Sequence, residues 1–410
     1  MAQAAPSITI QGTPVQPSDS LSPIERFRAM VAADCGLQDR LAPLYIPEQF
    51  IAAAIAAGAG QGIQLDEEML HQALKPDPLG IARWSDANVA SDGYPTRQWL
   101  PTAIVPTPQG AAVSWAHFAG EPLRQSFFES SARVACGLPI NRLLNKRSTL
   151  QSLIDTSAPD DALMPDGFIF HMSRCGSTLA AQMIAALPGA VVASEAAPID
   201  RAVQLNHQIA GLPLDIHVRV LRAIVAAIGR NRTGDERHYV IKLDAWHIKA
   251  LPLFRAAFPD TPWVFMYRDP LEVMVSQKRQ SGMMAVPGEI QPDTFATNSE
   301  DSVLAHGANV LGQICRSAVD GMAGGGGILI NYNEMPGAVP ERMLPHFGMA
   351  IDAADRAAMQ DATRQDVKSK DRTFVPDGAD KRAEATPDVR AVVDQYMAAP
   401  YAALEALRLG

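Results

Sequence analysis

The chain has 410 residues, which at about 100–200 residues per domain suggests two units. It carries 44 acidic and 35 basic residues, a net charge of −9, and this balance argues against a protein that holds nucleic acid by bulk charge. Its four cysteines show no metal-ligand or redox spacing, and residues 1–12 lack the basic start and apolar core of a secretory signal. No apolar run reaches the about 20 residues that span a bilayer. We therefore expect a cytoplasmic protein with reduced thiols, no membrane span and no nucleic-acid partner.

The first third of the chain carries structural patterns but no chemistry. Residues 1–23 are rich in Pro, Ser, Thr and Gln and predict a flexible tail. Helical periodicity follows over 24–75, then a loop-like stretch over 76–109, a short strand over 111–115 and a helix over 121–134. We expect a concentration of aromatic side chains in this region to pack against the rest of the protein; these are Trp115, His117, Phe118, Phe127 and Phe128.

A segment dominated by Ser, Ala, Pro and Asp over residues 155–165 reads as a linker. We place the domain boundary there. The expected organisation is a mainly helical accessory region over 24–160 and a second domain over 161–410.

The most informative segment follows the linker. Residues 168–172 predict a buried strand, and a Ser/Arg/Gly loop leads from it into a helix over 177–187. Backbone N–H groups of such a loop and of the helix's first turn converge on one point that the helix dipole makes electropositive, so the pattern predicts a phosphate or sulfate site. The triphosphate-binding version of this loop has Lys after its last Gly. Here Ser177 follows Gly176 and the basic side chain is Arg174, so the chemistry should differ from triphosphate hydrolysis.

Two more predicted strands end beside charged side chains. A short strand over 191–193 is followed closely by Glu195. A second strand over 239–243 contains Lys242 and is followed by Asp244. Each charged group is therefore expected at a strand end.

A fourth apolar run, residues 261–267, predicts a buried strand that ends at Arg268. A strong helix start follows it. Asp269 suits the N-cap, Pro270 fits the first helical position, and Glu272 completes a capping-box arrangement.

The helix after that strand carries Ser276, seven residues past the cap. This is close to two turns at about 100° per residue, so Ser276 lies on the face beside Arg268. One guanidinium and one hydroxyl are therefore expected to face a common anion.

Repeated strand and helix units, closing with a strand over 327–331, indicate an α/β fold. The sheet should be parallel, with helices on both faces in three layers. Ligands of such sheets lie at the carboxyl ends of the strands, where all of these polar groups fall.

At these residues the chain resembles the sulfotransferase family, whose donor is 3′-phosphoadenosine 5′-phosphosulfate. In that family a P-loop-like segment holds the 5′-phosphosulfate, and an Arg followed eight positions later by a Ser holds the 3′-phosphate. The matching residues are Arg174, Cys175, Gly176, Ser177 and Thr178 for the first signature, and Arg268 and Ser276 for the second. The resemblance runs from about Pro165 to the C-terminus.

The resemblance implies a P-loop NTPase-like fold and the in-line transfer of a sulfuryl group from this donor to a hydroxyl or amine, without a metal. The acceptor would be a small molecule or a glycan, and the sequence does not identify it, because acceptor pockets are built from loops that follow no code.

The same resemblance suggests catalytic roles. Arg174 is the candidate for stabilising the leaving group, and Lys242 matches a family Lys that adds charge stabilisation. Glu195 lies where several bacterial and carbohydrate sulfotransferases carry a catalytic Glu, whereas Asp244 lies where cytosolic members have a His base. Because Lys242 beside Asp244 would lower the pKa of that carboxylate, we favour Glu195 as the base. His247 is a third candidate, although a lone histidine in such a setting is more often a packing or surface residue.

Two further features stand beside these. Lys370 and Arg372 lie in a basic run that resembles the loop closing over the donor's 3′-phosphate in this family. Cys175 sits at a helix start, which can make a thiol reactive, and a small side chain tolerated in the loop is the simpler interpretation.

Two functions of other classes also fit the pattern. An apolar strand ending in Asp244 could carry magnesium in a nucleotide-dependent phosphotransferase, against which the missing Gly-Lys-[Ser/Thr] argues. A non-catalytic protein could keep the pocket and bind 3′,5′-adenosine bisphosphate without transferring sulfate.

Overall fold

The computed structural model describes residues 21–76, 89–90, 93–107, 110–290, 294–298, 300–364 and 378–410. The chain divides into two compact units, residues 1–79 with 137–144 and residues 80–136 with 145–410. Most of the predicted tail, residues 1–20, lies outside the described part. Residues 80–136 and 145–160, which the sequence assigns to the accessory region, group with the second unit.

The first unit is helical in its described residues, as the pattern over 24–75 predicts. A capping box between Ser22 and Glu25 starts its first helix, and Phe27, Phe50 and Leu70 are fully buried in it. Its helices are α1 (Pro23–Ala33), α2 (Cys35–Leu41), α3 (Pro47–Ala59), α4 (Glu67–Ala73) and α6 (Pro139–Leu144).

The second unit contains a four-stranded sheet that the sequence analysis largely misses. Its strands, in the order β1-β4-β3-β2, are β1 (Val89–Ala90), β2 (Trp99–Thr107), β3 (Gly110–His117) and β4 (Arg147–Thr149). The predicted strand over 111–115 is confirmed within β3. The loop-like interpretation of 76–109 is wrong for β2, which pairs antiparallel with β3. The helix expected over 121–134 is α5, and it begins later (Phe128–Gly137).

The second sheet of this unit is the predicted one. It has five parallel strands in the order β6-β7-β5-β8-β9. These strands are β5 (Gly167–His171), β6 (Ala190–Ser194), β7 (His238–Lys242), β8 (Trp263–Tyr267) and β9 (Gly327–Asn331). The expected parallel α/β sheet is therefore confirmed.

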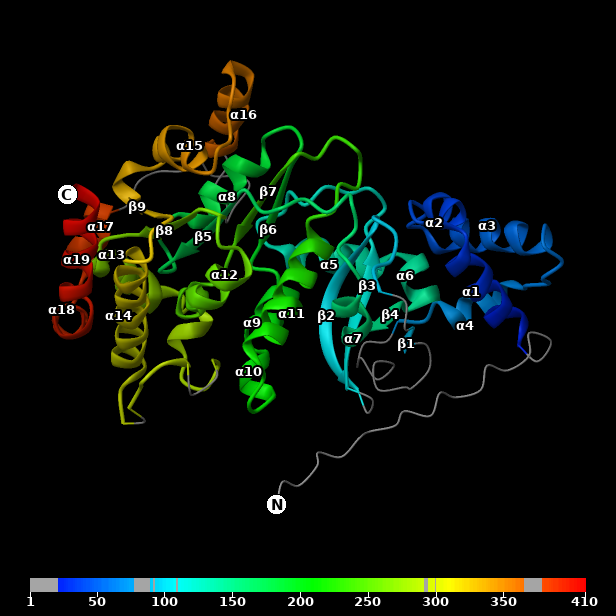
Figure 1. The fold of residues 1–410 in the computed structure, drawn as a ribbon, viewed down its shortest axis with the longest axis horizontal. Coiled ribbons are helices and arrows are strands. Elements are labelled where there is room, and N and C mark those ends of the chain that lie inside the picture. Colours follow the sequence, from blue (N-terminus) through cyan, green and yellow to red (C-terminus); the bar gives the residue numbers. More distant parts are fainter. Residues whose placement is uncertain are drawn as a thin grey trace. The chain divides into compact units, whose positions relative to one another are not determined.

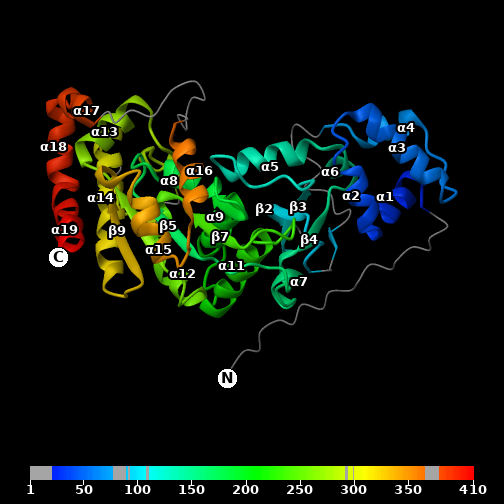
Figure 2. The same cartoon turned by 90° about the horizontal axis from the view of Figure 1, so that it is seen from above.

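Helices cover both faces of the parallel sheet, which gives the three expected layers. The main connecting helices are α8 (Ser177–Ala185), α11 (Leu214–Ile228), α12 (Leu251–Ala257), α13 (Pro270–Arg279) and α14 (Val303–Met322). Helix α8 packs against β6 and β7 with α16 (Ala353–Thr363) beside it, while α11 packs against α12. Figure 1 shows α8 and α16 above the sheet and α12 and α14 below it, and Figure 2 gives the view from above.

This division follows from the handedness of the crossovers. The connection from β5 to β6 moves toward one edge of the sheet. The connections from β6 to β7, from β7 to β8 and from β8 to β9 all move toward the other edge. Right-handed connections therefore put α8 on one face and α11, α12 and α14 on the other.

Shorter elements complete the second unit. They are α7 (Leu150–Asp155), α9 (Ala197–Val203), α10 (Leu205–Gln208), η3 (Ala245–Ala250), η4 (Met283–Ala285), η6 (Tyr332–Glu334), η7 (Val339–Met343), α15 (Leu344–His346), α17 (Gly378–Glu384), α18 (Pro387–Tyr396) and α19 (Ala398–Leu409). An aromatic core fixes the central strands, with the Phe168 and Phe254 rings 5.2 Å apart and those of Phe170 and Trp263 6.0 Å apart. Among the described residues, no helix has the length and apolarity needed to cross a membrane.

Candidate anion-binding and active site

The parallel sheet brings most of the predicted site residues to one edge. The loop after β5 carries Arg174, and Glu195 follows β6 directly. Lys242 ends β7, and Arg268 follows β8. Because the strands are parallel, these carboxyl ends lie on the same side of the sheet. The geometry is that of a ligand site of an open α/β fold.

The loop after β5 has an unusual backbone. Ser173, Arg174 and Gly176 all have left-handed conformations, with φ of 71°, 53° and 85°. Non-glycine residues rarely adopt this region, and such strain concentrates at functional sites. A Cβ at Gly176 would lie 2.9 Å from the Tyr332 ring, so the position has no room for a side chain. Helix α8 then starts without a side-chain cap, which leaves its first N–H groups for an anion.

Arg174 lies at this loop, half-buried. Its guanidinium Nη2 donates to the carbonyl oxygen of Gln280 at 2.6 Å, just after α13. Partial burial lowers the pKa of Arg174 from its ordinary value. The side chain therefore joins the β5 loop to the end of the helix that carries Ser276.

Cys175 is fully buried, and its thiol donates to the carbonyl oxygen of Met266 at 3.1 Å. Burial raises the pKa of Cys175 to about 11. This thiol contributes to packing, which is the simpler of the two interpretations given by the sequence.

We expect Cys175 to resist alkylation in the native protein at pH 7. A buried thiol with a raised pKa supplies almost no accessible thiolate, so the exposed Cys35 should react with iodoacetamide at least about tenfold faster. Mass spectrometry of timed samples measures both rates. Equal rates would show that the loop opens or that the thiolate is stabilised.

Glu195 and Lys242 form an ion pair across neighbouring strands. The Lys242 ammonium, which is fully buried, contacts Glu195 Oε1, and the Glu195 backbone N–H donates to the Lys242 carbonyl at 2.7 Å. Glu195 has a left-handed φ of 49°. Its backbone strain and its pairing both hold the carboxylate at the strand ends.

His171 joins this pair, and the sequence analysis did not identify it. Its Nδ1 accepts from the Ser173 backbone N–H at 3.0 Å, and its Nε2 lies 3.4 Å from Glu195 Oε1. Burial, with the Lys242 charge, lowers the pKa of His171. Because Nδ1 accepts a hydrogen bond, the ring's proton lies on Nε2. Its position at the end of the predicted strand, just before the anion-binding loop, could have marked it as a site residue.

The choice of Glu195 over Asp244 as the base assumed that Lys242 lies beside Asp244 and lowers its pKa. This assumption is wrong. Lys242 pairs with Glu195 and not with Asp244, because β6 and β7 are neighbours and Ser194 lies opposite Lys242. Burial alone would raise the pKa of Glu195, but the Lys242 ammonium and His171 hold it well below its ordinary value. Burial raises the pKa of Asp244 to about 7. Asp244 is therefore the more basic of the two carboxylates in this structure.

His247 is held in a structural network. Its Nδ1 accepts from the Asp244 backbone N–H at 3.2 Å, and its Nε2 donates to Asp200 Oδ1 at 2.8 Å. Trp246 Nε1 donates to the same Asp200 oxygen at 2.7 Å. With both ring nitrogens engaged and the residue buried, His247 caps η3 and has a structural role.

Asp200, Asp244 and His247 each place one potential ligand atom within 4.8 Å of the others. This is the one group of the described residues that has the donor set of a metal site. The hydrogen bonds just given account for its geometry without an ion.

Arg268 lies at the end of β8, almost fully buried. Its Nε donates to Glu272 Oε2 at 2.6 Å, and its guanidinium lies 4.0 Å from the centre of the Tyr332 ring. The other oxygen of Glu272 pairs with Arg382 of α17. The planar cation is thus held over an aromatic face beside the β5 loop, since Tyr332 also meets Gly176.

The start of α13 follows the prediction in two respects and departs from it in one. Asp269 caps the helix by accepting from the Leu271 N–H at 2.9 Å, and Pro270 is its first residue. The expected capping box at Glu272 is wrong, because the Arg268 and Arg382 guanidinium groups take its carboxylate instead. Ser276 lies half-buried in the same helix.

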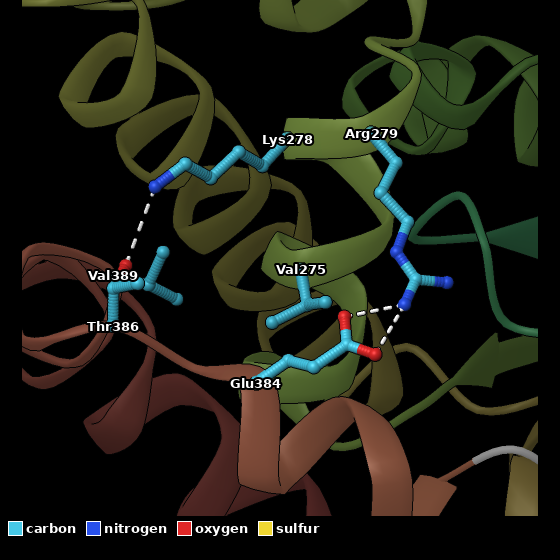
Figure 3. A pocket seen from close by; sticks show the side chains of 6 residues that line it. All are labelled: Val275, Lys278, Arg279, Glu384, Thr386 and Val389. Atoms are coloured by element: carbon cyan, nitrogen blue, oxygen red, sulfur yellow. Dashed lines mark hydrogen bonds and ion pairs between the residues drawn. The ribbon is translucent and has the colours of Figure 1, made fainter.

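A small pocket of about 160 Å³ lies on α13, between it and the C-terminal helices α17 and α18. Figure 3 shows that Lys278 reaches Thr386 and that Arg279 forms an ion pair with Glu384 across it. These contacts fasten α13 to α17 and α18. Lys370 and Arg372, predicted to close over the donor, lie outside the described residues.

Comparison with protein-family models found no match, and comparison with curated proteins found none. Comparison with solved structures found similarity to the sulfotransferase domain of the Synechococcus PCC 7002 olefin synthase, at 17% identity over 58% of this chain and 97% of that one, with a TM-score of 0.37. A sulfotransferase from Alicyclobacillus acidocaldarius is similar at 14% identity over 60% and 97%, with a TM-score of 0.35. A sulfotransferase from Mycobacterium tuberculosis H37Rv is similar at 14% identity over 63% and 82%, with a TM-score of 0.37.

Proposed function

We propose that this protein is a sulfotransferase that moves a sulfuryl group from 3′-phosphoadenosine 5′-phosphosulfate to a hydroxyl or amine acceptor. The observation that supports the proposal is that the two candidate anion-binding segments follow adjacent strands. The strained loop before α8 follows β5, Arg268 follows β8, and the two strands are hydrogen-bonded neighbours. A donor with phosphates at both its 5′ and 3′ positions requires two such sites.

The roles of the first site follow from its chemistry. Backbone N–H groups at Ser177 and Thr178 would bind the 5′-phosphate at the start of α8. The Arg174 guanidinium would exchange its contact with the Gln280 carbonyl for the bridging oxygen, which gains negative charge as the sulfur–oxygen bond breaks. At the second site Arg268 and Ser276 would hold the 3′-phosphate.

The transfer itself is an in-line displacement. The acceptor oxygen or nitrogen bonds to sulfur, the bond from sulfur to the 5′-phosphate oxygen breaks, and 3′,5′-adenosine bisphosphate leaves. The acceptor's proton passes to a carboxylate, which we assign to Glu195. Lys242 is the cation nearest this carboxylate and would stabilise the charge that develops on the sulfuryl group.

Donor binding would change the basicity of Glu195. A sulfuryl group beside Lys242 competes with Glu195 for the ammonium and adds negative charge nearby, and both effects raise the pKa of the carboxylate. Glu195 would thus become a base only when the donor is in place. Its strained position at the strand end favours it over Asp244, whose side chain is the more buried.

The 3′-phosphate site gives a direct prediction. We expect Arg268→Gln to weaken binding of 3′,5′-adenosine bisphosphate by about 1.5–3 kcal/mol, the value of hydrogen bonds to a charged partner. Gln keeps a donor for Glu272, so the fold should be retained. Calorimetry measures the affinity, and Arg279→Gln, on the exposed side of the same helix, is the matched control. Unchanged affinity in Arg268→Gln would exclude Arg268 from the site.

The overall reaction is tested by incubating the protein with donor labelled in its sulfuryl group and with cell extract. Label should pass to an acceptor in the presence of a metal chelator. Transfer of phosphate from ATP that requires magnesium would instead identify a phosphotransferase. Tight binding of 3′,5′-adenosine bisphosphate without any transfer would identify a binding protein.

A further inference from the structure

A second and larger pocket lies at the opposite end of β6 from Glu195. Its volume is about 720 Å³, within the range of about 300–1,000 Å³ that holds small molecules. Gly189, Ala190 and Val191, at the amino end of the strand, line it. Five residues of strand at about 3.3 Å each separate it from the carboxyl end, so it is not the site described above.

Arg232 lines this pocket and is 1% exposed. Within the described part of the chain its Nε, Nη1 and Nη2 are all buried and have no hydrogen-bond partner. Its guanidinium lies 5.8 Å from the Phe118 ring. A buried cation whose N–H groups lack acceptors destabilises the folded protein.

The neighbouring Arg230 shows how this chain satisfies a buried guanidinium that has only a structural role. Its Nε and Nη2 donate to the two carboxylate oxygens of Asp161, at 2.6 and 2.9 Å. Its Nη1 donates to the Pro95 carbonyl at 3.1 Å. Arg230 and Arg232 are two residues apart, yet within the described residues every side-chain nitrogen of Arg230 is hydrogen-bonded and none of Arg232 is.

Two carboxylates near Arg232 attract its charge without accepting hydrogen bonds from it. Glu236 and Glu121 draw the cation electrostatically, and neither accepts a hydrogen bond from it. Glu236 Oε2 instead accepts from the backbone N–H and the hydroxyl of Thr233, both at 2.7 Å. The N–H groups of Arg232 therefore have no acceptor among the described residues and are available to a bound ligand.

The rest of the lining fits an amphipathic ligand. Pro122, Leu123 and Pro188 give it an apolar wall. Arg124 and Arg237 add two further cations at exposed positions, against the single exposed carboxylate of Asp235.

We propose that this pocket binds a small organic anion whose carboxylate or phosphate accepts hydrogen bonds from Arg232 and whose apolar part lies against Pro122, Leu123 and Pro188. A planar guanidinium matches two oxygens of one such group. Each Arg232 nitrogen exposes less than 1 Å², so binding includes a shift of the pocket wall.

The test uses benzoate as the probe, with benzyl alcohol as its neutral counterpart, and the full-length protein. Calorimetry and thermal melting should detect benzoate and not benzyl alcohol. Arg232→Met should weaken benzoate binding at least about tenfold, the loss expected for hydrogen bonds to a charged group. Arg232→Lys keeps the charge but cannot make the bidentate contact, so its affinity for benzoate should lie between those of the parent protein and Arg232→Met. The surface variant Arg219→Met, in the same unit, should bind as the parent protein does.

Two further readouts separate a ligand site from a structural arginine. Without benzoate, Arg232→Met should melt at a higher temperature than the parent, because a buried cation without acceptors has been removed. A crystal structure with benzoate should place its carboxylate on Arg232. The proposal is overturned if Arg232→Met binds benzoate unchanged, or if the crystal structure has Glu236 bonded to Arg232 and benzoate elsewhere. If Arg232→Met does not fold, unchanged binding by Arg232→Lys is equally decisive against it.

Discussion

The variant Glu195→Gln is expected to lower turnover by about 10² to 10⁴ while donor affinity stays nearly constant, because a positioned base contributes about this much. Gln has the same shape as Glu and can remain beside Lys242 and His171, so the local structure should persist. Single-turnover kinetics with saturating donor measures the chemical step, and calorimetry with 3′,5′-adenosine bisphosphate measures affinity.

Asp244→Asn is the matched comparison, and it should lower turnover less than Glu195→Gln does. Asp244 has the raised pKa in the protein without donor, about 7, so it is the natural rival. If the Asn variant loses turnover and the Gln variant keeps it, the base is Asp244 and the donor does not activate Glu195.

The variant Lys242→Met is expected to lower turnover by about 10² to 10³, the usual cost of removing a preorganised electrostatic group. It should also destabilise the protein by about 3 kcal/mol at pH 7, because it breaks a buried ion pair and leaves the Glu195 carboxylate without its cation. The control is Lys249→Met, which removes an exposed lysine from η3, the element that follows β7. It should change neither turnover nor stability.

The stability of the pair should depend on pH in a defined direction. The folded-state pKa of Glu195 is lowered to about 2, so its stabilising contribution is complete above the unfolded-state pKa of about 4.3 and is lost as the pH falls through the folded-state pKa. Melting temperatures between about pH 6 and pH 3 should therefore fall less steeply in Lys242→Met than in the parent protein. Identical slopes in the two proteins would mean that Lys242 does not lower the pKa of Glu195.

The sequence predicted the parallel sheet well and the smaller sheet poorly, for physical reasons. Buried parallel strands are continuous apolar runs, and each predicted run, including 261–267 and 327–331, overlaps a strand of the structure. Strand β2 contains Pro101 and Pro106, which read as loop. The structure accommodates them because β2 is an edge strand whose register shifts between Pro101 and Ala103.

The sequence predicted that the candidate site residues follow strands, but it did not predict how their side chains pair. Local patterns identified Arg174 and Arg268, because each follows an apolar run and precedes a helix start. The Glu195–Lys242 pair depends on β6 lying beside β7, and His171 joins it from β5 on the other side of β7. Strand order is a property of the whole fold, and sequence spacing alone placed Lys242 beside Asp244.

The central claim is tested most directly by comparing two nucleotides in one calorimetric titration. A sulfotransferase that uses this donor requires a dedicated 3′-phosphate site, which we assign to Arg268 and Ser276. The protein should bind 3′,5′-adenosine bisphosphate at least about tenfold more tightly than 5′-AMP, the effect of one or more hydrogen bonds to a charged group. Equal affinity for the two nucleotides would contradict the assignment of that site and the donor with it.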